Sequence, residues 1–384
     1  MLVPMLSSPY AFSLACIFAL LFYYIRSKRK QRAQLPDYFK LSGVPPPTPL
    51  PHFDISKARP RPYRPFRWQY IQHMSLKKME PDWWLELEST YCERIAQRKA
   101  LYAQYGKKIV NALPGSEGAC RELMEMVIQF LTHRYPNQFI YDSNDGAFEN
   151  RILGTVTQTR QLNPLVVLLE TVPEDFLITQ GDAKTGLYSL RAGVSCSAVG
   201  WNLGTKIGKN LSEIHVPVPD YKERMKFSMD RFFRKMACEK PIQRGSWGLE
   251  KGQPLFLQPN TPEWAEREDP DAQVEMDISD VNLRVDWQTL RRLPVSRAIV
   301  FNFKALFTPV VQLREEPYVP KLLLKVLKEG KKELLEYKGT QLVEGVVKPK
   351  LEEWAKEQED KGWVPKSWEE RTLDEDPFFP GWHS

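Results

Sequence analysis

The sequence predicts an α+β fold that follows a single N-terminal transmembrane helix. Three observations support this prediction. The first 25 residues contain no Asp, Glu, Lys or Arg. Short β-prone runs bounded by turn residues fill the middle of the chain, and longer stretches with helical spacing lie before and after them. The chain has 384 residues and no visible repeat, so we expect one domain with a substantial core.

Residues 1–25 have the composition of a membrane anchor. The run from Tyr10 to Ile25 is almost continuously apolar, and about 20 such residues cross a hydrocarbon core. Five Lys and Arg follow within residues 26–32, and positive residues flank the cytoplasmic end of a span. We therefore expect a lumenal N-terminus and a cytosolic domain on an organelle that the sequence does not identify. A cleaved signal peptide is the alternative, but its positive charge would precede the apolar run.

Charge and cysteine usage agree with a cytosolic domain. Residues 26–67 hold eleven Lys and Arg against two Asp, so the basic character of this chain is juxtamembrane. Such a segment suits anionic lipid headgroups, and no nucleic-acid motif accompanies it. The five cysteines are widely spaced without a CxxC pair, which is typical of a reducing compartment. The sequon at Asn210 would then stay unglycosylated.

The chain divides into four parts. These are the transmembrane anchor over residues 1–25, a basic, Pro-rich juxtamembrane linker over 26–62, a main domain over 63–340, and a C-terminal helix with an acidic and aromatic tail over 341–384. Five prolines between residues 45 and 51 favour extended polyproline II. Aromatic residues among the prolines of residues 60–67 indicate that this part packs on the domain.

Spacing and turn residues place the elements of the domain. Helices are predicted over residues 81–105, 117–134 and 221–238, and two charged helices follow Pro317 and Pro349. Strands are predicted over residues 176–179, 187–197, 246–249 and 298–303.

Several common motifs are excluded by their spacing. The segment 204–210 has three residues between its glycines where a phosphate loop has four. The segment 193–197 begins like a nucleophile elbow and lacks the closing glycine. The chain contains no GxGxxG, HExxH or CxxCH sequence. No catalytic residue is assigned from these patterns.

Among the five histidines, His215 has the most distinctive surroundings. It lies in the segment 211–219 (LSEIHVPVP), just before a predicted helix. Pro217 and Pro219 restrict the backbone on both sides of the turn that follows His215. A rigid imidazole at the edge of an apolar segment is what an axial haem ligand requires. A histidine that is simply hydrogen-bonded at a helix start fits the same pattern, and the residues alone leave both interpretations open.

Several long motifs are found at residues 63–67 (YRPFR), 74–78 with 84–98, 172–176 (VPEDF), 190–193 leading to Trp201, 206–221, 244–247 (RGSW), 283–294 (LRVDWQTLRRLP), 298–303 and 315–317. Together they resemble one known family, the alpha subunit of haem-dependent oxidative N-demethylase, also called the HRQ family and formerly a domain of unknown function. The sequence departs from the family pattern at Ser75, Ser246 and the pair Asp286-Trp287, where Gly, Asn and Glu-Arg are expected.

The resemblance implies a Per-Arnt-Sim-like antiparallel sheet with flanking helices and a non-covalent haem b. On that basis the segments 172–199, 244–249 and 298–303 should share one sheet, with residues 284–294 close to it. The resemblance makes His215 the candidate axial ligand of the haem iron, with His73 and Cys196 as alternatives. The side chains suggested to pair with the haem propionates are those of Arg284, Arg291 and Arg292. Salt bridges at the end of a strand are an equally open interpretation of these three arginines.

The resemblance also implies a function. A haem-dependent monooxygenase would hydroxylate the N-methyl carbon of a small secondary amine with dioxygen, and the product would collapse to a smaller amine and formaldehyde. Electrons would come from a separate flavin or iron–sulfur reductase, because this chain has neither a dinucleotide fingerprint nor an iron–sulfur spacing. The alternatives are a non-catalytic haem-binding, sensor-like or interaction module at a membrane, and a tethered domain without a cofactor.

Overall fold

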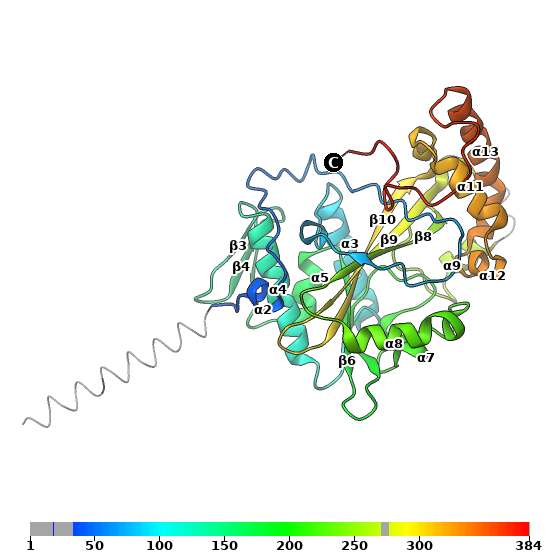
Figure 1. The fold of residues 1–384 in the computed structure, drawn as a ribbon. Coiled ribbons are helices and arrows are strands. Elements are labelled where there is room, and N and C mark those ends of the chain that lie inside the picture. Colours follow the sequence, from blue (N-terminus) through cyan, green and yellow to red (C-terminus); the bar gives the residue numbers. More distant parts are fainter. Residues whose placement is uncertain (1–17, 19–33, 270–275, 384) are drawn as a thin grey trace, which may run out of the picture.

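A computed structural model of the protein describes residue 18, residues 34–269 and residues 276–383 (Figure 1). Apart from Phe18, the predicted anchor lies outside the described residues, as does most of its basic flank. No helix within the described residues combines the length and the hydrophobicity needed to cross a bilayer.

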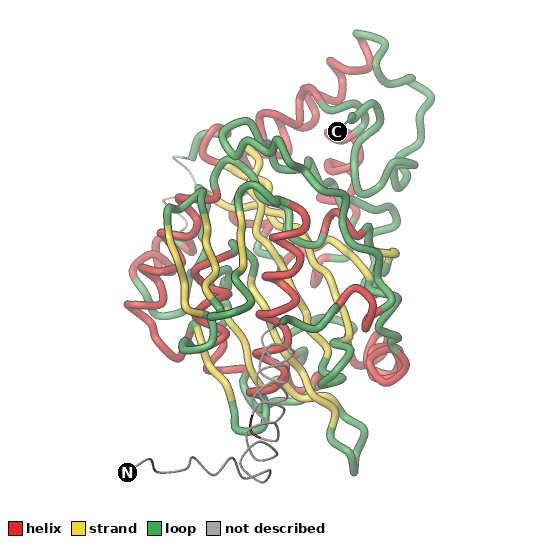
Figure 2. Tube along the Cα trace, turned by 90° about the vertical axis from the view of Figure 1, so that its left-hand side faces the viewer, coloured by secondary structure: helices red, strands yellow, loops and turns green. Residues whose placement is uncertain are grey.

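A seven-stranded antiparallel sheet lies at the centre of the molecule. The order of its strands is β1 (Lys77–Lys78), β8 (Ile242–Lys251), β9 (Val281–Arg292), β10 (Ile299–Pro309), β6 (Asp175–Gly181), β7 (Tyr188–Val194) and β2 (Val110–Ala112). Figure 2 shows the long strands running side by side. The prediction that segments 172–199, 244–249 and 298–303 share one antiparallel sheet is therefore confirmed. The motif at 283–294 lies within the sheet, because most of it forms β9, which pairs with β8 and β10.

A smaller antiparallel sheet and several helices complete the fold. The small sheet contains β3 (Phe139–Tyr141), β4 (Ala147–Asn150) and β5 (Thr155–Gln158). The α-helices are α2 (Tyr38–Ser42), α3 (Tyr91–Tyr105), α4 (Glu117–Arg134), α5 (Pro164–Thr171), α6 (Leu203–Lys206), α7 (Leu211–Ile214), α8 (Lys226–Lys235), α9 (Pro262–Glu268), α11 (Val319–Glu329), α12 (Lys332–Tyr337) and α13 (Glu344–Asp360). The mixed α+β class is therefore confirmed.

The two faces of the main sheet have different coverings. Successive strand residues point to opposite faces, so Gln288 and Leu290 point to one face of the sheet and Trp287 and Arg291 to the other. The face of Leu290 packs against residues of α7, α8 and the turn before α8, and we call it the His215 face. The face of Trp287 packs against two larger apolar clusters, one with α3, α4 and α5 and one with α11 and α13, and we call it the Trp287 face. In Figure 1, α7 and α8 lie together below the sheet, whereas α11 and α13 gather at its upper end.

The predicted helix over residues 81–105 is wrong in its first part. A single 3₁₀ turn covers Pro81–Trp83, and α3 begins only at Tyr91. In between, the backbone N–H groups form long-range or local bonds in place of helical ones: Leu87 donates to the Tyr135 hydroxyl and Ser89 to the Ala58 carbonyl. This irregular segment buries Trp84, Leu85 and Leu87.

Two other helices follow their predictions more closely. α4 has the predicted bounds, 117–134. The helix predicted over 221–238 is a π-helical turn at Tyr221–Met225 followed by α8, which ends at Lys235.

The arm that leads into the domain packs along it. α2 lies on α4, where the Tyr38 hydroxyl donates to Glu125 at 2.5 Å. Further on, the guanidinium of Arg64 makes a bidentate ion pair with Glu316, with N–O distances of 2.7 and 2.6 Å. The ring of Tyr63 stacks on Trp287 with 3.6 Å between centroids. The aromatic residues of segment 60–67 therefore pack on the sheet, as predicted.

Candidate functional site around His215

The position of His215 is set by a very short helix. Asn210 caps α7, because its side chain accepts the N–H of Glu213 while the Glu213 side chain accepts the N–H of Asn210. This reciprocal capping box satisfies two N–H groups that would otherwise lack partners. α7 ends after four residues, and His215 is the residue that closes it. The half-buried imidazole stacks on the ring of Tyr221, with centroids 4.8 Å apart and an interplanar angle of 9°.

The hydrogen bond of the His215 ring fixes its tautomer. Nδ1 lies 2.7 Å from the carbonyl oxygen of Leu211. A carbonyl oxygen only accepts hydrogen bonds, so Nδ1 carries the proton and Nε2 keeps a free lone pair. No described residue hydrogen-bonds Nε2. A backbone carbonyl that orients the far nitrogen is the usual support of a metal-binding imidazole.

The surroundings of His215 also keep it neutral. Burial lowers its pKa, the Leu211 hydrogen bond raises it, and the positive charges of Arg244 and Lys206 lower it further. The net shift is downward from 6.5, so the imidazole is uncharged at neutral pH. A neutral imidazole is the form that binds a metal ion.

Among the cations near His215, Arg244 on β8 has the surroundings that best suit a bound anion. Its guanidinium has no ion pair or hydrogen-bond partner among the described residues, and its Nε is buried. Burial, and then the neighbouring charge of Arg67, lower its pKa to about 10. An unpartnered buried cation is costly in free energy unless something compensates its charge.

Arg244 belongs to a group of cations that we call the basic cluster: Arg67, Lys206, Arg244 and Lys338. Lys338 donates to the Trp247 carbonyl at 2.5 Å and to the Ser246 hydroxyl at 3.3 Å. Burial lowers its pKa to about 8, Asp286 opposes that shift, and Arg244 adds to it. The cluster thus brings positive charge from the arm, α6, β8 and the end of α12 towards one region of the His215 face. Carboxylates of a bound group would find partners there.

The three arginines predicted to pair with propionates do not converge. Arg284 donates to Asp286, to the Ser197 carbonyl and to the Pro254 carbonyl. Arg291 lies on the Trp287 face, with its guanidinium 3.5 Å from the centroid of Trp84.

Arg292 is on the same face as Arg284 but is fully engaged. It donates to the carbonyls of Met236, Phe233 and Arg297 and to the hydroxyl of Tyr188. Arg284 and Arg292 therefore have their donors occupied, and Arg291 lies on the opposite face of the sheet from Leu290. The role in propionate binding predicted for these arginines is better suited to Arg244.

The two alternative ligands have less suitable surroundings than His215. Both ring nitrogens of His73 lie within hydrogen-bond distance of the Ser75 hydroxyl, at 3.0 and 3.3 Å. Cys196 is fully buried, and burial raises the pKa of its thiol to about 12. The thiolate that would bind iron is therefore disfavoured.

One of the departures noted in the sequence has a local explanation. Ser75 has φ of 53°, in the left-handed region where glycine is favoured. Its N–H and hydroxyl both bond the His73 ring. These bonds offset part of the cost of that backbone conformation.

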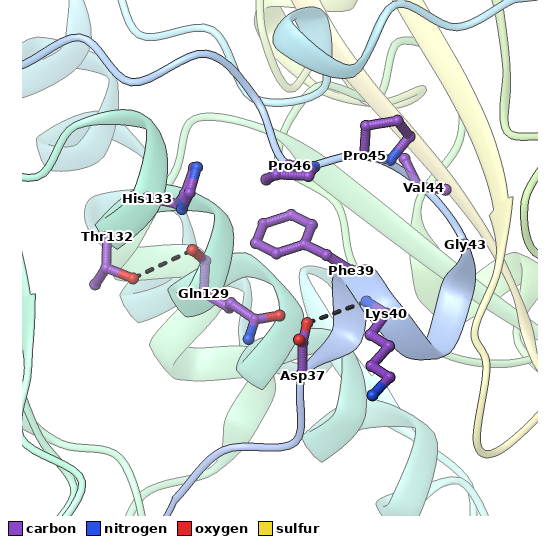
Figure 3. Close-up of a pocket in the computed structure, with 10 residues that line it drawn as sticks. All are labelled: Asp37, Phe39, Lys40, Gly43, Val44, Pro45, Pro46, Gln129, Thr132 and His133. Atoms are coloured by element: carbon purple, nitrogen blue, oxygen red, sulfur yellow. Dashed lines mark hydrogen bonds between the residues drawn. The ribbon is translucent and has the colours of Figure 1, made fainter.

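The largest groove described in the structure lies elsewhere. It has a volume of about 730 Å³ and runs between the α2 arm and α4 (Figure 3). Phe39 and His133 meet edge to face in it, at 5.5 Å between centroids. Asp37 accepts the N–H of Lys40, so this carboxylate is already engaged locally. The groove offers no convergent set of free polar groups, and His215 does not line it.

The donor groups around His215 are of the kinds that a haem requires. The site has a neutral imidazole with a free Nε2, a half-buried guanidinium without a partner among the described residues, and further cations around it. These are the partners that an iron ion and two propionates require. None of the four pockets described for this structure is lined by His215, so the fit rests on the donors. In the sequence, Arg244 appears only as part of the motif 244–247, because the lack of a partner in three dimensions cannot be recognised from the sequence.

A comparison with known protein families agrees with the motifs. Residues 75–348 match the family described as haem-dependent oxidative N-demethylase, alpha subunit-like. The match covers well over half of the chain and includes β8, β9, β10, α7 and both Arg244 and His215. At the level of the family, the description names a haem-dependent oxidoreductase-type function. This chain belongs to the haem-dependent oxidative N-demethylase alpha-subunit-like family.

Proposed function

We propose that this protein is a membrane-anchored haem-dependent monooxygenase that removes an N-methyl group from a small secondary amine. The observation that carries the proposal is the His215 imidazole, which the Leu211 carbonyl holds with a free Nε2. Family membership supports the haem-dependent oxidative chemistry. When bound, the haem b would supply the activation of dioxygen, and the protein would supply position and electrostatics.

The topology of the sheet supports a Per-Arnt-Sim-like core. Five strands of the sheet, taken in chain order, are β6, β7, β8, β9 and β10. Across the sheet they lie in the order β8-β9-β10-β6-β7, so the first and last strands are neighbours in the middle. Numbered from one to five in chain order, this is 2-1-5-4-3 read from β7, the order of a Per-Arnt-Sim sheet. Helices α6, α7 and α8 follow β7 and return the chain to β8 over the His215 face.

Individual residues would then have distinct tasks. His215 would hold the iron through Nε2, while Tyr221 limits rotation of its ring. Arg244 and its neighbours in the basic cluster would pair with the propionates. Asp286 lies on the His215 face, is half-buried, and accepts from Arg284 at 3.0 Å. Its carboxylate is the acidic group of that face best placed to orient a cationic amine, because it is half-buried, whereas Asp175, which is paired with Arg98, is fully buried. Electrons would come from a separate flavin or iron–sulfur reductase.

A visible spectrum tests the haem assignment. The described domain, produced with haem, should show a Soret band. His215→Ala should abolish or strongly shift that band while leaving the circular dichroism of the fold intact, because a half-buried ring contributes little packing. His73→Ala is the matched control and should keep the band. A band unchanged in His215→Ala, or lost in His73→Ala, would contradict the assignment.

A non-catalytic haem-binding or sensor-like module is the second candidate. The departures at Ser246 and Trp287 favour it, because Ser246 contacts Lys338 in the basic cluster and Trp287 is buried against the arm. Formaldehyde release separates the two candidates. A haem-loaded protein that is reduced but releases no formaldehyde from any small secondary amine would support the sensor and contradict the enzyme.

The membrane anchor has its own test. A reporter fused after Ser384 should be cytosolic, and Asn210 should remain unglycosylated. Moving the basic residues of 26–32 ahead of Tyr10 should invert the orientation, because the Lys and Arg bias sets it. Glycosylation of the wild-type chain at Asn210 would contradict this topology.

A further inference from the structure

A second cavity lies on the Trp287 face, on the other side of the sheet from Gln288 and Leu290. Its volume is about 170 Å³. It sits where the two apolar clusters of that face meet: Trp84 and Tyr135 on its walls belong to one cluster, and Tyr63 and Trp287 to the other. We call it the seam cavity. A single water needs only about 10–15 Å³ of such volume, so the seam cavity has room for a small organic molecule.

Buried polar atoms without a partner concentrate around the seam cavity. Eight side chains in the described residues have such an atom, and four of them line this cavity: Trp84, Arg134, Glu174 and Trp287. In folded proteins such atoms are few, and each one calls for an explanation. Three of the four are N–H donors, two indole Nε1 atoms and the Nε of Arg134, and the fourth is a carboxylate oxygen of Glu174. The walls therefore offer both unused donors and an unused acceptor.

Glu174 differs from the other acids of the cavity. Glu86 is paired with Arg61, and Glu88 lies 3.6 Å from the Nζ of Lys304. Glu174 is 2% exposed and has no ion pair among the described residues. Burial raises its pKa to about 7, although the positive charges of Lys304 and Arg98 oppose that shift. A carboxyl in that state would gain strongly from a cationic partner.

The aromatic walls favour a cation as well. Tyr63, Trp83, Trp84, Tyr135 and Trp287 all line the cavity. The face of an aromatic ring attracts ammonium groups, and methylated ammonium groups in particular. Two ring faces in this region already carry a guanidinium, since Arg61 lies 4.6 Å from the centroid of Trp83 and Arg291 lies 3.5 Å from that of Trp84.

We propose that the seam cavity binds a small amino-acid zwitterion, with its ammonium group at Glu174 and its carboxylate at the N–H donors of Trp84, Trp287 and Arg134. This arrangement gives each unpartnered atom of the walls a partner of the right kind. An N-methyl group on the nitrogen would lie against the aromatic rings. The site is separate from His215, so its occupancy does not depend on haem.

Titration calorimetry on the haem-free domain tests the proposal. The probes are sarcosine, glycine, dimethylammonium chloride and sodium acetate. Sarcosine should bind, and the two probes that carry only one of its charged groups should bind about tenfold or more weakly, because each loses a charge-assisted hydrogen bond. Tryptophan fluorescence should change in parallel, since three indoles line the cavity.

Two variants locate the site. Glu174→Gln keeps the shape of the side chain and should weaken sarcosine binding about tenfold or more. Glu250→Gln is the matched control: Glu250 is a buried acid of β8 that pairs with Arg267 away from the cavity, and its variant should bind like the wild type. His215→Ala should also bind like the wild type, which separates this test from the test of the haem site.

Three results would overturn the proposal. One is the absence of sarcosine binding at millimolar concentration, which would leave water as the content of the cavity. Another is dimethylammonium or acetate binding as tightly as sarcosine. The third is unchanged sarcosine binding in Glu174→Gln.

Discussion

The two faces of strand β9 differ in which polar groups near them lack a hydrogen-bond partner. On the His215 face the strand presents Asp286 and Gln288, both half-buried, towards a region of cations. On the Trp287 face it presents Val285 and Trp287, which are buried in apolar clusters. The polar groups without partners follow this division. On the first face the Nε of Arg244 has no partner, whereas on the second the seam cavity is lined by Glu174, Arg134 and two tryptophans with unpartnered atoms. The Nε of Arg291 also lacks a partner on that second face.

The difference shows what each face can do. Open positive charge next to a neutral imidazole suits a large anionic cofactor that carries a metal. A cavity with aromatic walls and a buried acid that has no ion pair suits a small cation or zwitterion. Because successive residues of β9 point to opposite faces, the proposed haem site and the proposed zwitterion site lie on opposite sides of the same sheet. Each of the following predictions tests one side of this comparison against the other.

The largest effect is expected from packing. Trp287→Ala should lower the free energy of unfolding by about 3–5 kcal/mol, because it removes a buried ring stacked on Tyr63. Gln288→Ala, the next residue on the opposite face, should change it by less than about 1 kcal/mol. Urea unfolding followed by circular dichroism measures both. Equal losses in the two variants would mean that the faces are not packed differently.

The next effect concerns pH and Glu174. Its pKa is raised from 4.5 to about 7 by burial, so the native state keeps a proton that the unfolded chain releases between those values. The contribution of Glu174 to stability is therefore fully present below pH 4.5 and is lost as the pH rises through about 7, on the order of 3 kcal/mol in total. Glu174→Gln should remove this part of the pH dependence.

Urea unfolding of the wild type and of Glu174→Gln, compared between pH of about 4.5 and about 8, isolates the contribution of Glu174. The wild type should lose stability relative to the variant as the pH rises. A constant difference between the two proteins would show that Glu174 ionises normally. A bound zwitterion should reduce the loss, because its ammonium group stabilises the ionised carboxylate.

The next effect concerns Arg244, whose side chain should lower the stability of the haem-free protein. In the haem-free protein, Arg244→Met should raise the free energy of unfolding by about 1–3 kcal/mol, because it removes a half-buried charge whose buried Nε has no partner. The same variant should bind haem more weakly. Arg292→Met is the matched control and should destabilise, since its guanidinium serves three carbonyls and a hydroxyl. Thermal unfolding and haem titration measure the two effects, and a destabilised Arg244→Met would argue against a free guanidinium.

Local pattern accounts for the parts of the fold that the sequence predicted well. The strands at 176–179 and 298–303 were recognisable because β-branched and aromatic residues are concentrated there. α4 has regular apolar spacing and was placed correctly at both ends. Segment 84–90 looked helical but is irregular, because Tyr135 and Ala58, distant in the chain, take its N–H groups. That competition is tertiary and cannot be seen in a local window.

The site was predictable only in part, for the same reason. His215 stood out because Pro217 and Pro219 restrict its backbone, whereas the bond to Leu211 that frees Nε2 appears only in three dimensions. Arg291 and Arg292 are adjacent in sequence, and alternation sends them to opposite faces. The motif therefore suggested a pair where the sheet separates them. The seam cavity gave no sequence signal, since its walls come from the arm, the irregular segment before α3, the end of α4 and the strands β9 and β10.

The smallest effect on stability is expected from the caps of two short helices, one on each face. Asn210 caps α7 on the His215 face, and Asn163 caps α5 on the Trp287 face. Replacing either by Ala should cost about 1 kcal/mol of unfolding free energy, the usual cost of losing a cap.

The local consequences of the two replacements should differ. α7 has four residues and holds the Leu211 carbonyl against Nδ1 of His215, so Asn210→Ala should loosen that bond and raise the solvent exposure of the ring. Burial is the main cause that lowers the pKa of His215, so its pKa should move back up towards 6.5 in Asn210→Ala and stay unchanged in Asn163→Ala. Proton NMR of the imidazole resonances measures this pKa directly. If the two variants shift it equally, the capping box of α7 is not what positions the ligand.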